Sequence, residues 1–141
     1  MKSRMILIAY QDDLWVKSLS SYFHGNGYKI ETAKRVSELI QKIKKGNIEV
    51  VLLDDEIEGI KAYDLIPLLK TNSKIQFIVI SSESSLSYVR RLRGTGIFYQ
   101  AMKPIDLEEI KSAVACAFEK IQREHPKEGL FSFLIPRLVP A

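Results

Sequence analysis

Acidic, hydroxyl and basic side chains stand at the ends of four apolar runs of this sequence. In chain order these positions hold Asp12, Asp13, Asp54, Ser81 and Lys103. A pair of carboxylates can bind a divalent cation, a single carboxylate can accept a transferred group, and a lysine can balance the charge of either. A hydroxyl can hydrogen-bond a phosphoryl oxygen. These residue types therefore point to phosphoryl or metal-ion chemistry, provided that the fold brings them together.

The pattern of apolar residues predicts an α/β fold that does so. Strand-like runs cover residues 4–9, 28–32, 48–54, 74–81 and 96–102, and each is followed by apolar residues at helical spacing. Five strands that alternate with five helices imply a parallel sheet with helices on both faces. In such sheets ligands bind at the carboxyl ends of the strands, which is where the candidate residues stand.

Capping signals set the expected helix starts. Pro67 is tolerated in the first turn of a helix but not in its interior, so we expect the third helix to start late, with Asp64 as its cap. Asp106 and Glu109 have the spacing of a capping box and predict the start of the last helix.

Composition limits the class of protein. The chain has 141 residues, 46% hydrophobic and 27% charged, which fits one globular domain. The net charge of +4 is scattered and favours a solvated surface over direct nucleic-acid binding. Cys116 is the only cysteine, so no disulfide can form within the chain, and a reducing cytoplasmic location is expected. No apolar run is long enough to span a membrane.

Three motifs resemble the receiver domain of bacterial two-component response regulators, over residues 4–122. "VVLLDDEIEG" is similar to the phosphoacceptor strand and its loop, "FIVISS" to the strand that ends in a switch hydroxyl, and "MKPIDLEEI" to a Lys-Pro turn. The resemblance implies a flavodoxin-like receiver fold with strand order 2-1-3-4-5. It also implies that Asp54 is the phosphoacceptor, Lys103 the phosphoryl clamp and Ser81 the switch hydroxyl, with a cis bond before Pro104.

The function implied is that of a signalling domain, not of an enzyme. Asp54 would take a phosphoryl group from a histidine kinase or phosphotransfer protein, and the domain would signal by altered protein contacts. An alternative is a pseudo-receiver, a protein-interaction module whose state does not depend on phosphate. A flavodoxin-like enzyme or cofactor binder is disfavoured, because no glycine-rich phosphate loop follows the first strand.

The resemblance implies a Mg²⁺ site as well, formed by two adjacent acids at the end of the first strand. Counting back from the Gly-Tyr pair at residues 27–28 places Tyr10 and Gln11 in those positions. Asp12 and Asp13 come one and two places later, where acids also stabilise a helix start. We favour helix capping over metal binding for these two acids, which leaves any Mg²⁺ site weakened.

The remaining candidate ligands of Mg²⁺ are Asp54, Asp12 and the backbone carbonyl of Glu56. Glu56 belongs to a loop that crowds four acids into residues 54–58. This loop could form an acidic pocket that recovers cation binding with different ligands. It could instead be solvated, with only Asp54 facing inward, and we favour the solvated loop because runs of charge are usually exposed.

Two features concern partners. An aromatic switch residue is frequent in the family three places before the lysine, and Gln100 stands there, so the usual coupling is in doubt. Arg90, Arg91 and Arg93 lie on the fourth helix. They indicate either a basic docking patch or a polar outer face, and the sequence does not choose. A homodimer through the fourth helix, fifth strand and fifth helix would use this surface.

The last residues do not fit the receiver pattern. We therefore divide the chain into a receiver domain, residues 1–124, and an apolar tail or linker start, residues 125–141. The tail contains "LFSFLIPRLVP", which is too apolar for a simple flexible end. We expect it to pack against protein, either its own domain or that of a partner.

Overall fold

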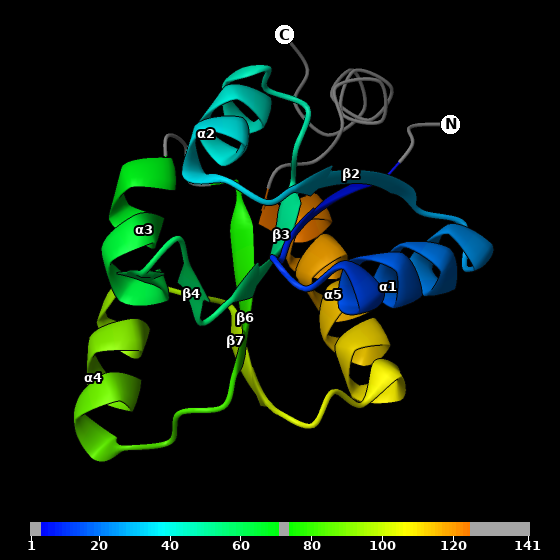
Figure 1. Cartoon of the computed structure of the whole chain (residues 1–141). Coiled ribbons are helices and arrows are strands. Elements are labelled where there is room, and N and C mark those ends of the chain that lie inside the picture. Colours follow the sequence, from blue (N-terminus) through cyan, green and yellow to red (C-terminus); the bar gives the residue numbers. More distant parts are fainter. Residues whose placement is uncertain (1–3, 71–73, 125–141) are drawn as a thin grey trace, which may run out of the picture.

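Five parallel strands form one sheet at the centre of the computed structural model, which describes residues 4–70 and 74–124 (Figure 1). The strand order is β2-β1-β3-β6-β7. It confirms the predicted order 2-1-3-4-5, because a small separate hairpin takes the labels β4 and β5. The sheet strands are β1 Met5–Ala9, β2 Lys29–Ala33, β3 Val50–Asp54, β6 Gln76–Ser81 and β7 Tyr99–Met102.

Helices cover both faces of the sheet, as the sequence pattern predicts. Helices α1 and α5 lie on one face, and α2, α3 and α4 lie on the other (Figure 1). The helices are α1 Asp13–Gly25, α2 Val36–Lys44, α3 Ala62–Leu69, α4 Leu86–Gly94 and α5 Leu107–Glu124.

The two faces of the sheet form two separate apolar cores, because side chains alternate along each strand. In β3, Val50 and Leu52 belong to the core under α1 and α5, whereas Val51 and Leu53 belong to the core under α2, α3 and α4. The same alternation directs Asp54, the last residue of β3, toward the α1 and α5 side. The sheet thus fixes the side on which this carboxylate lies.

Side chains cap three helix starts, and the sequence predicts two of them, those of α1 and α5. The carboxylate of Asp12 accepts a hydrogen bond from the amide of Leu14 at 3.0 Å. Ser85 caps α4, and Asp106 accepts from the amides at the start of α5. Each cap satisfies amides that have no partner inside the helix, which stabilises the helix start.

The predicted start of α3 is wrong. The helix begins at Ala62 with Lys61 as its N-terminal neighbour, and Asp64 lies inside the first turn. Pro67 therefore occupies the interior of the helix, where it removes the amide that would donate to the Tyr63 carbonyl. Leu65, Ile66 and Leu69 of this helix are buried, and this tertiary packing outweighs the local preference of the proline.

A two-stranded hairpin, β4 Glu56–Ile57 and β5 Ile60–Lys61, follows β3 directly. Its turn residues, Glu58 and Gly59, have φ values of 52° and 79°. Positive φ at both central residues is what the two-residue turn of type I′ requires. The sequence pattern favours a loop here, so the hairpin is an addition to the predicted fold.

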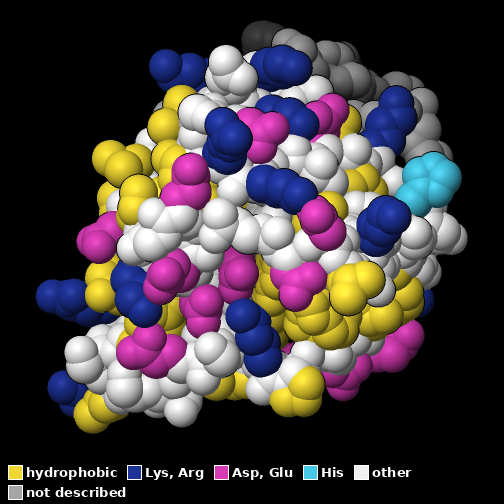
Figure 2. Space-filling view, viewed as in Figure 1, with side chains coloured by type: hydrophobic (Ala, Val, Ile, Leu, Met, Phe, Trp, Pro, Cys, Tyr) yellow, Lys and Arg dark blue, Asp and Glu magenta, His cyan; other side chains and the backbone are white. Residues whose placement is uncertain are grey.

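In the part of the chain that the structure describes, no helix has the length and apolarity needed to cross a membrane. Acidic and basic side chains are intermixed over the surface seen in Figure 2, beside exposed hydrophobic side chains. The predicted tail, residues 125–141, lies outside the described residues.

Candidate functional site

The carboxyl ends of three strands, β1, β3 and β7, border a cavity of about 330 Å³ at one edge of the sheet. Asp54 ends β3, Tyr10 directly follows β1, and Lys103 directly follows β7. All three residues line the cavity, which is completed by Asp12, Trp15, Pro104 and Ile105. The structure therefore brings Asp54 and Lys103 together from positions 49 residues apart in the sequence.

Asp54 and Lys103 form the central ion pair of this cavity. The Nζ atom of Lys103 donates a hydrogen bond to Oδ1 of Asp54 at 2.9 Å, and the two side chains are 30% and 15% exposed. The backbone amide of Lys103 donates to the Ser81 carbonyl at 2.8 Å. The bond between Lys103 and Pro104 is cis, as the sequence predicts.

Burial sets the ionisation behaviour of this pair. It raises the pKa of Asp54 above its ordinary value, and the hydrogen bond and charge of Lys103 offset this only in part. Burial also works to lower the pKa of Lys103, but the hydrogen bond to Asp54 and the charges around it leave that pKa raised. The pair thus combines a desolvated carboxylate, which is a good nucleophile, with a firmly protonated ammonium group.

Ser81 is fully buried at the end of β6. Its hydroxyl donates to the carbonyl of Glu83 at 3.0 Å and accepts from the amide of Glu83 at 2.9 Å. The hydroxyl is therefore engaged with the loop that leads from β6 to α4. A change in its hydrogen bonds would act on this loop.

Asp55 also faces the site, although the sequence analysis favoured Asp54 as the only inward acid of this loop. Oδ2 of Asp55 accepts from the amide of Ser82 at 3.0 Å and from its hydroxyl at 3.2 Å. Burial works to raise the pKa of Asp55, but the hydrogen bonds from Ser82 and the Lys103 charge leave it lowered. The feature of the sequence that could have indicated this contact is the pair of hydroxyl residues, Ser81 and Ser82, at the end of the neighbouring strand.

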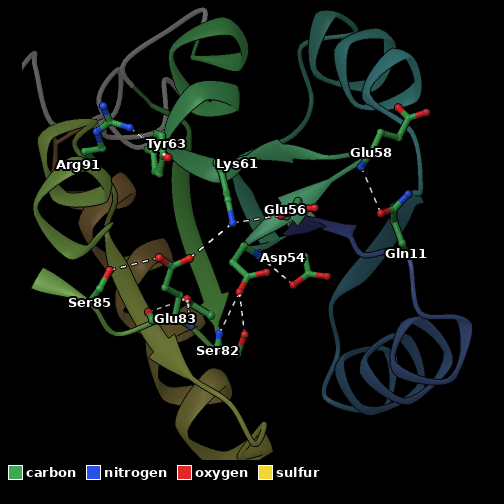
Figure 3. A network of polar contacts seen from close by, with 12 residues as sticks. Gln11, Asp54, Glu56, Glu58, Lys61, Tyr63, Ser82, Glu83, Ser85 and Arg91 are labelled. Carbon is green, nitrogen blue, oxygen red and sulfur yellow. Dashed lines mark hydrogen bonds and ion pairs between the residues drawn. The ribbon is translucent and has the colours of Figure 1, made fainter. Parts of the chain in front are cut away.

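The other acids of the segment have partners as well (Figure 3). The ammonium group of Lys61 lies 3.2 Å from Glu56 and 3.5 Å from Glu83, and so links the hairpin to the loop after β6. Oε1 of Glu58 accepts from the amide of Val36, the first residue of α2, at 2.8 Å. These contacts tie the loops around Asp54 to one another.

Tyr10 and Gln11 occupy the approach to Asp54 from β1. Tyr10 is only 2% exposed, its hydroxyl is buried, and Lys103 Nζ lies 5.5 Å from the centre of its ring. Burial and the nearby Asp54 carboxylate raise the pKa of Tyr10 to about 12. Gln11 does not turn toward the cavity, because its Oε1 accepts from the amide of Glu58 at 3.2 Å (Figure 3).

Comparison with known proteins identifies the family. The model of the response regulator receiver domain matches residues 6–115. The chain belongs to the response regulator receiver domain family. It is 25% identical over 97 residues to sporulation initiation phosphotransferase F of Bacillus subtilis (strain 168), a match that covers 68% of this chain and 78% of that protein.

Solved receiver structures share its fold. The CheY-like response regulator receiver domain protein from Methanospirillum hungatei JF-1 has a TM-score of 0.81 at 18% identity, covering 87% of this chain and 99% of that one. The beryllofluoride-activated NtrC4 receiver domain dimer has a TM-score of 0.76 at 26% identity, covering 83% of this chain and 98% of that one.

The donors of this receiver domain do not fit a Mg²⁺ site. Hard cations of this kind favour oxygen ligands in an octahedral arrangement, with carboxylates prominent among them. Asp12 lines the cavity, but its carboxylate caps α1, and Asp13 pairs with Lys34. Glu56, whose carbonyl is the third predicted ligand, lies in β4. Within residues 4–70 and 74–124 no three His, Cys, Asp or Glu side chains form a group that could hold a metal.

Strand β7 of this receiver domain carries Gln100 where the family frequently has an aromatic residue, as noted from the sequence. Gln100 is half-buried in β7, three residues before Lys103. The hydroxyl of neighbouring Tyr99 donates to Glu109 of α5 at 2.7 Å, and the Tyr99 side chain is 37% exposed. Tyr99 is therefore engaged with α5.

Proposed function

We propose that Asp54 of this receiver domain accepts a phosphoryl group from a histidine kinase or phosphotransfer protein. The observation that carries the proposal is the 2.9 Å contact between Lys103 Nζ and Asp54 Oδ1 in a cavity at the carboxyl ends of the strands. The carboxylate is accessible, desolvated and paired with a fixed cation. The name of the Bacillus subtilis relative, a phosphotransferase, supports the same chemistry.

The residues around Asp54 have separate roles in the proposed step. One carboxylate oxygen of Asp54 attacks phosphorus, a P–O bond forms, and the P–N bond of the donor phosphohistidine breaks, with the electron pair leaving on the imidazole. The Lys103 ammonium balances charge on the phosphoryl oxygens. To contact the phosphoryl oxygens, Lys103 leaves its direct contact with the Asp54 carboxylate oxygen. In this proposal the domain is a phosphoryl acceptor and turns over no separate substrate.

Signal output follows from the position of Ser81. Its hydroxyl bonds only the backbone of Glu83 among the contacts described above, so a new hydrogen bond to a phosphoryl oxygen competes with these contacts. The loop between β6 and α4 then rearranges, and with it the surface of α4. Output through altered protein contacts in the cytoplasm, including pairing with a second copy through α4, β7 and α5, is part of this proposal.

Incubation with acetyl phosphate and Mg²⁺ tests the proposal. We expect the intact mass to rise by one phosphoryl group, and the amide signals of Asp54, Ser81 and Lys103 to shift. Both responses are lost in Asp54→Asn. The matched control is Glu119→Gln, which neutralises an exposed acid of α5 outside the cavity and retains phosphorylation. A wild-type protein that gains no phosphoryl group contradicts the proposal.

The second candidate function is the pseudo-receiver, an interaction module that does not respond to phosphate. One observation favours it: the buried ring of Tyr10 stands where receivers are expected to carry an acid, and Gln11 is turned to Glu58. For this candidate, binding of the unidentified partner would be the same for wild type and Asp54→Asn. The absence of any mass gain and of any amide shift with acetyl phosphate would support it.

A further inference from the structure

The Tyr10 hydroxyl is a buried polar group without a hydrogen bond of good geometry in the described part of the chain. Its side chain is 2% exposed and lines the same cavity as Asp54 and Lys103. Ile6, Ile8 and Tyr10 share the core under α1 and α5, which is the side of the sheet that Asp54 faces. Buried hydroxyls nearly always have a partner, so this one calls for an explanation.

We infer that the Tyr10 hydroxyl donates a hydrogen bond to an oxygen of a phosphoryl-like anion at Asp54, so that this receiver domain holds the anion with Tyr10 and Lys103 and without a divalent cation. The inference rests on the proposed function, because it names how the same site binds the transferred group. It differs from the proposed function in assigning a role to Tyr10 and in removing the need for Mg²⁺.

The charges of the site explain why a neutral donor is useful there. An incoming phosphoryl group adds negative charge beside Asp54 and Asp55. In the described residues Lys103 is the ammonium group within 4.0 Å of both carboxylates, at 2.9 and 3.9 Å. The donors for a metal ion do not fit, as shown above. A phenol keeps its proton at neutral pH and can therefore donate to an anionic oxygen, where hydrogen bonds are strongest.

The position of the hydroxyl is consistent with this role. Tyr10 lines the same cavity as Asp54 and Lys103, and the Nζ atom of Lys103 lies 5.5 Å from the centre of the Tyr10 ring. An anion bonded to Asp54 and paired with Lys103 would thus meet the hydroxyl. Lys103 can only donate to the Tyr10 hydroxyl, so the hydroxyl proton has no acceptor in the described residues and would gain one in the loaded state.

The step is balanced without a metal or a redox partner. With acetyl phosphate as donor, an oxygen of Asp54 forms the new P–O bond, the P–O bond to the acetyl group breaks, and acetate leaves with the bonding electrons. No net proton transfer is needed. Tyr10 and Lys103 only stabilise charge on the phosphoryl oxygens as the transfer proceeds.

The test compares wild type, Tyr10→Phe and Tyr99→Phe as full chains. Tyr10→Phe removes the hydroxyl and keeps the ring, whereas Tyr99→Phe removes a hydroxyl that donates to Glu109, outside the cavity. Each protein is incubated with acetyl phosphate in excess chelator and, separately, in Mg²⁺, and the rate of labelling of Asp54 is measured by mass spectrometry.

We expect wild type to be labelled in chelator at a rate within about twofold of the rate in Mg²⁺, since a metal ion that does not contribute leaves the activation free energy nearly unchanged. Tyr10→Phe is expected to lose about tenfold or more in chelator, the effect of one hydrogen bond to a charged oxygen. Tyr99→Phe is expected to match wild type. Labelling of wild type only in Mg²⁺, or equal rates for Tyr10→Phe and wild type in chelator, overturns the inference and leaves the proposed function standing.

A second measurement separates the two proposals if no condition gives labelling, an outcome that contradicts the proposed function. Inorganic phosphate is titrated into each protein in chelator, and the amide signals of Tyr10, Asp54 and Lys103 are followed. Saturable binding by wild type that is weaker in Tyr10→Phe retains the anion site. No binding, or equal binding by both proteins, overturns the inference. The amide spectrum also reports whether Tyr10→Phe is folded.

Discussion

At the scale of single residues, the Asp54 carboxyl group is the reactive group of the site and also lowers the stability of the folded domain. Burial raises its pKa above the ordinary value of 3.8, so folding disfavours the ionised form. The stability that goes with this raised pKa is complete below the unfolded-state pKa and is lost as the pH rises through the folded-state pKa. At neutral pH the carboxylate therefore costs the domain stability in exchange for reactivity.

Asp54→Asn should accordingly be more stable than wild type at pH 7, because Asn keeps an acceptor for Lys103 without a buried charge. The difference should shrink as the pH falls through the folded-state pKa of Asp54, and vanish below the unfolded-state value. Urea denaturation at a series of pH values measures it. Glu119→Gln, which neutralises an exposed acid of α5, is the control and should show little change. A lower stability of Asp54→Asn at pH 7 would refute the assignment of a net desolvation cost.

At the scale of secondary-structure elements, the start of α2 depends on a residue from the β4–β5 turn. Glu58 accepts from the Val36 amide at 2.8 Å, and its own amide donates to Gln11 at 3.2 Å. The carboxylate of Glu38, in the first turn of α2, accepts from the amide of Arg35 at 3.2 Å, and the Glu58 carboxylate adds a bond to the Val36 amide. Glu58 thus joins the hairpin to α2 through its carboxylate and to the residue after β1 through its backbone amide.

Replacing Glu58 with Ala should cost about 1 kcal/mol of unfolding free energy, the usual effect of removing a helix cap. Glu58→Gln should cost less, because its amide oxygen can still accept from Val36. The backbone strain of the positive φ at this position is similar for Ala, Gln and Glu. Differences in unfolding free energy among the three proteins therefore report the cap hydrogen bond. Urea denaturation gives the free energies, and hydrogen exchange at the Val36 amide reports the cap directly. Equal stability of all three proteins would show that the contact contributes nothing.

Helix α3 is the element where local preference and tertiary packing disagree. Pro67 is exposed and lies inside the helix. Pro67→Ala should stabilise the domain by about 2 kcal/mol, since the penalty for proline in a helix interior exceeds the entropy lost from the unfolded state. Leu68→Ala, at an exposed neighbour, is the matched control and should change stability by less than about 0.5 kcal/mol. Thermal unfolding of the three proteins compares them, and no gain for Pro67→Ala would contradict this account.

At the scale of the whole molecule, ion pairs and hydrogen bonds connect loops that lie far apart in the sequence. Asp55 holds Ser82 after β6, and Lys61 joins the hairpin to Glu83. Ser81 bonds the same loop. A chemical change at Asp54 can therefore reach the loop before α4 through these side-chain contacts, and does not require an aromatic residue at position 100.

The apolar tail belongs to this scale too, as a prediction from the sequence. Removing the residues after Glu128 should lower either the number of chains that associate in solution or the stability of the domain. Exposed apolar segments tend to be contact sites, which is the reason for this expectation. Light scattering and thermal unfolding of the full and shortened chains measure the two effects. If the number of chains per particle and the stability are both unchanged, there is no reason to assign the tail a packing role.

The sequence by itself determined the architecture and the meeting of Asp54 with Lys103. Apolar runs of strand length, separated by helical periods, permit few arrangements other than a parallel sheet. Such a sheet brings the carboxyl ends of its strands to one edge, so residues that follow the strands converge whatever the details of the loops. The sequence also showed the displacement of Asp12 and Asp13 into the start of α1, because register along a strand is fixed.

Only the tertiary structure decided what surrounds that pair. The contact of Gln11 with Glu58, the bonds from Ser82 to Asp55 and the early start of α3 depend on how separate segments pack against one another. Local sequence signals carry little information on such contacts, because each competes with water and with other partners until the fold is complete. The burial of the Tyr10 hydroxyl beside Asp54 is of this kind: the sequence placed a tyrosine there, and the packed cavity left its hydroxyl free to donate.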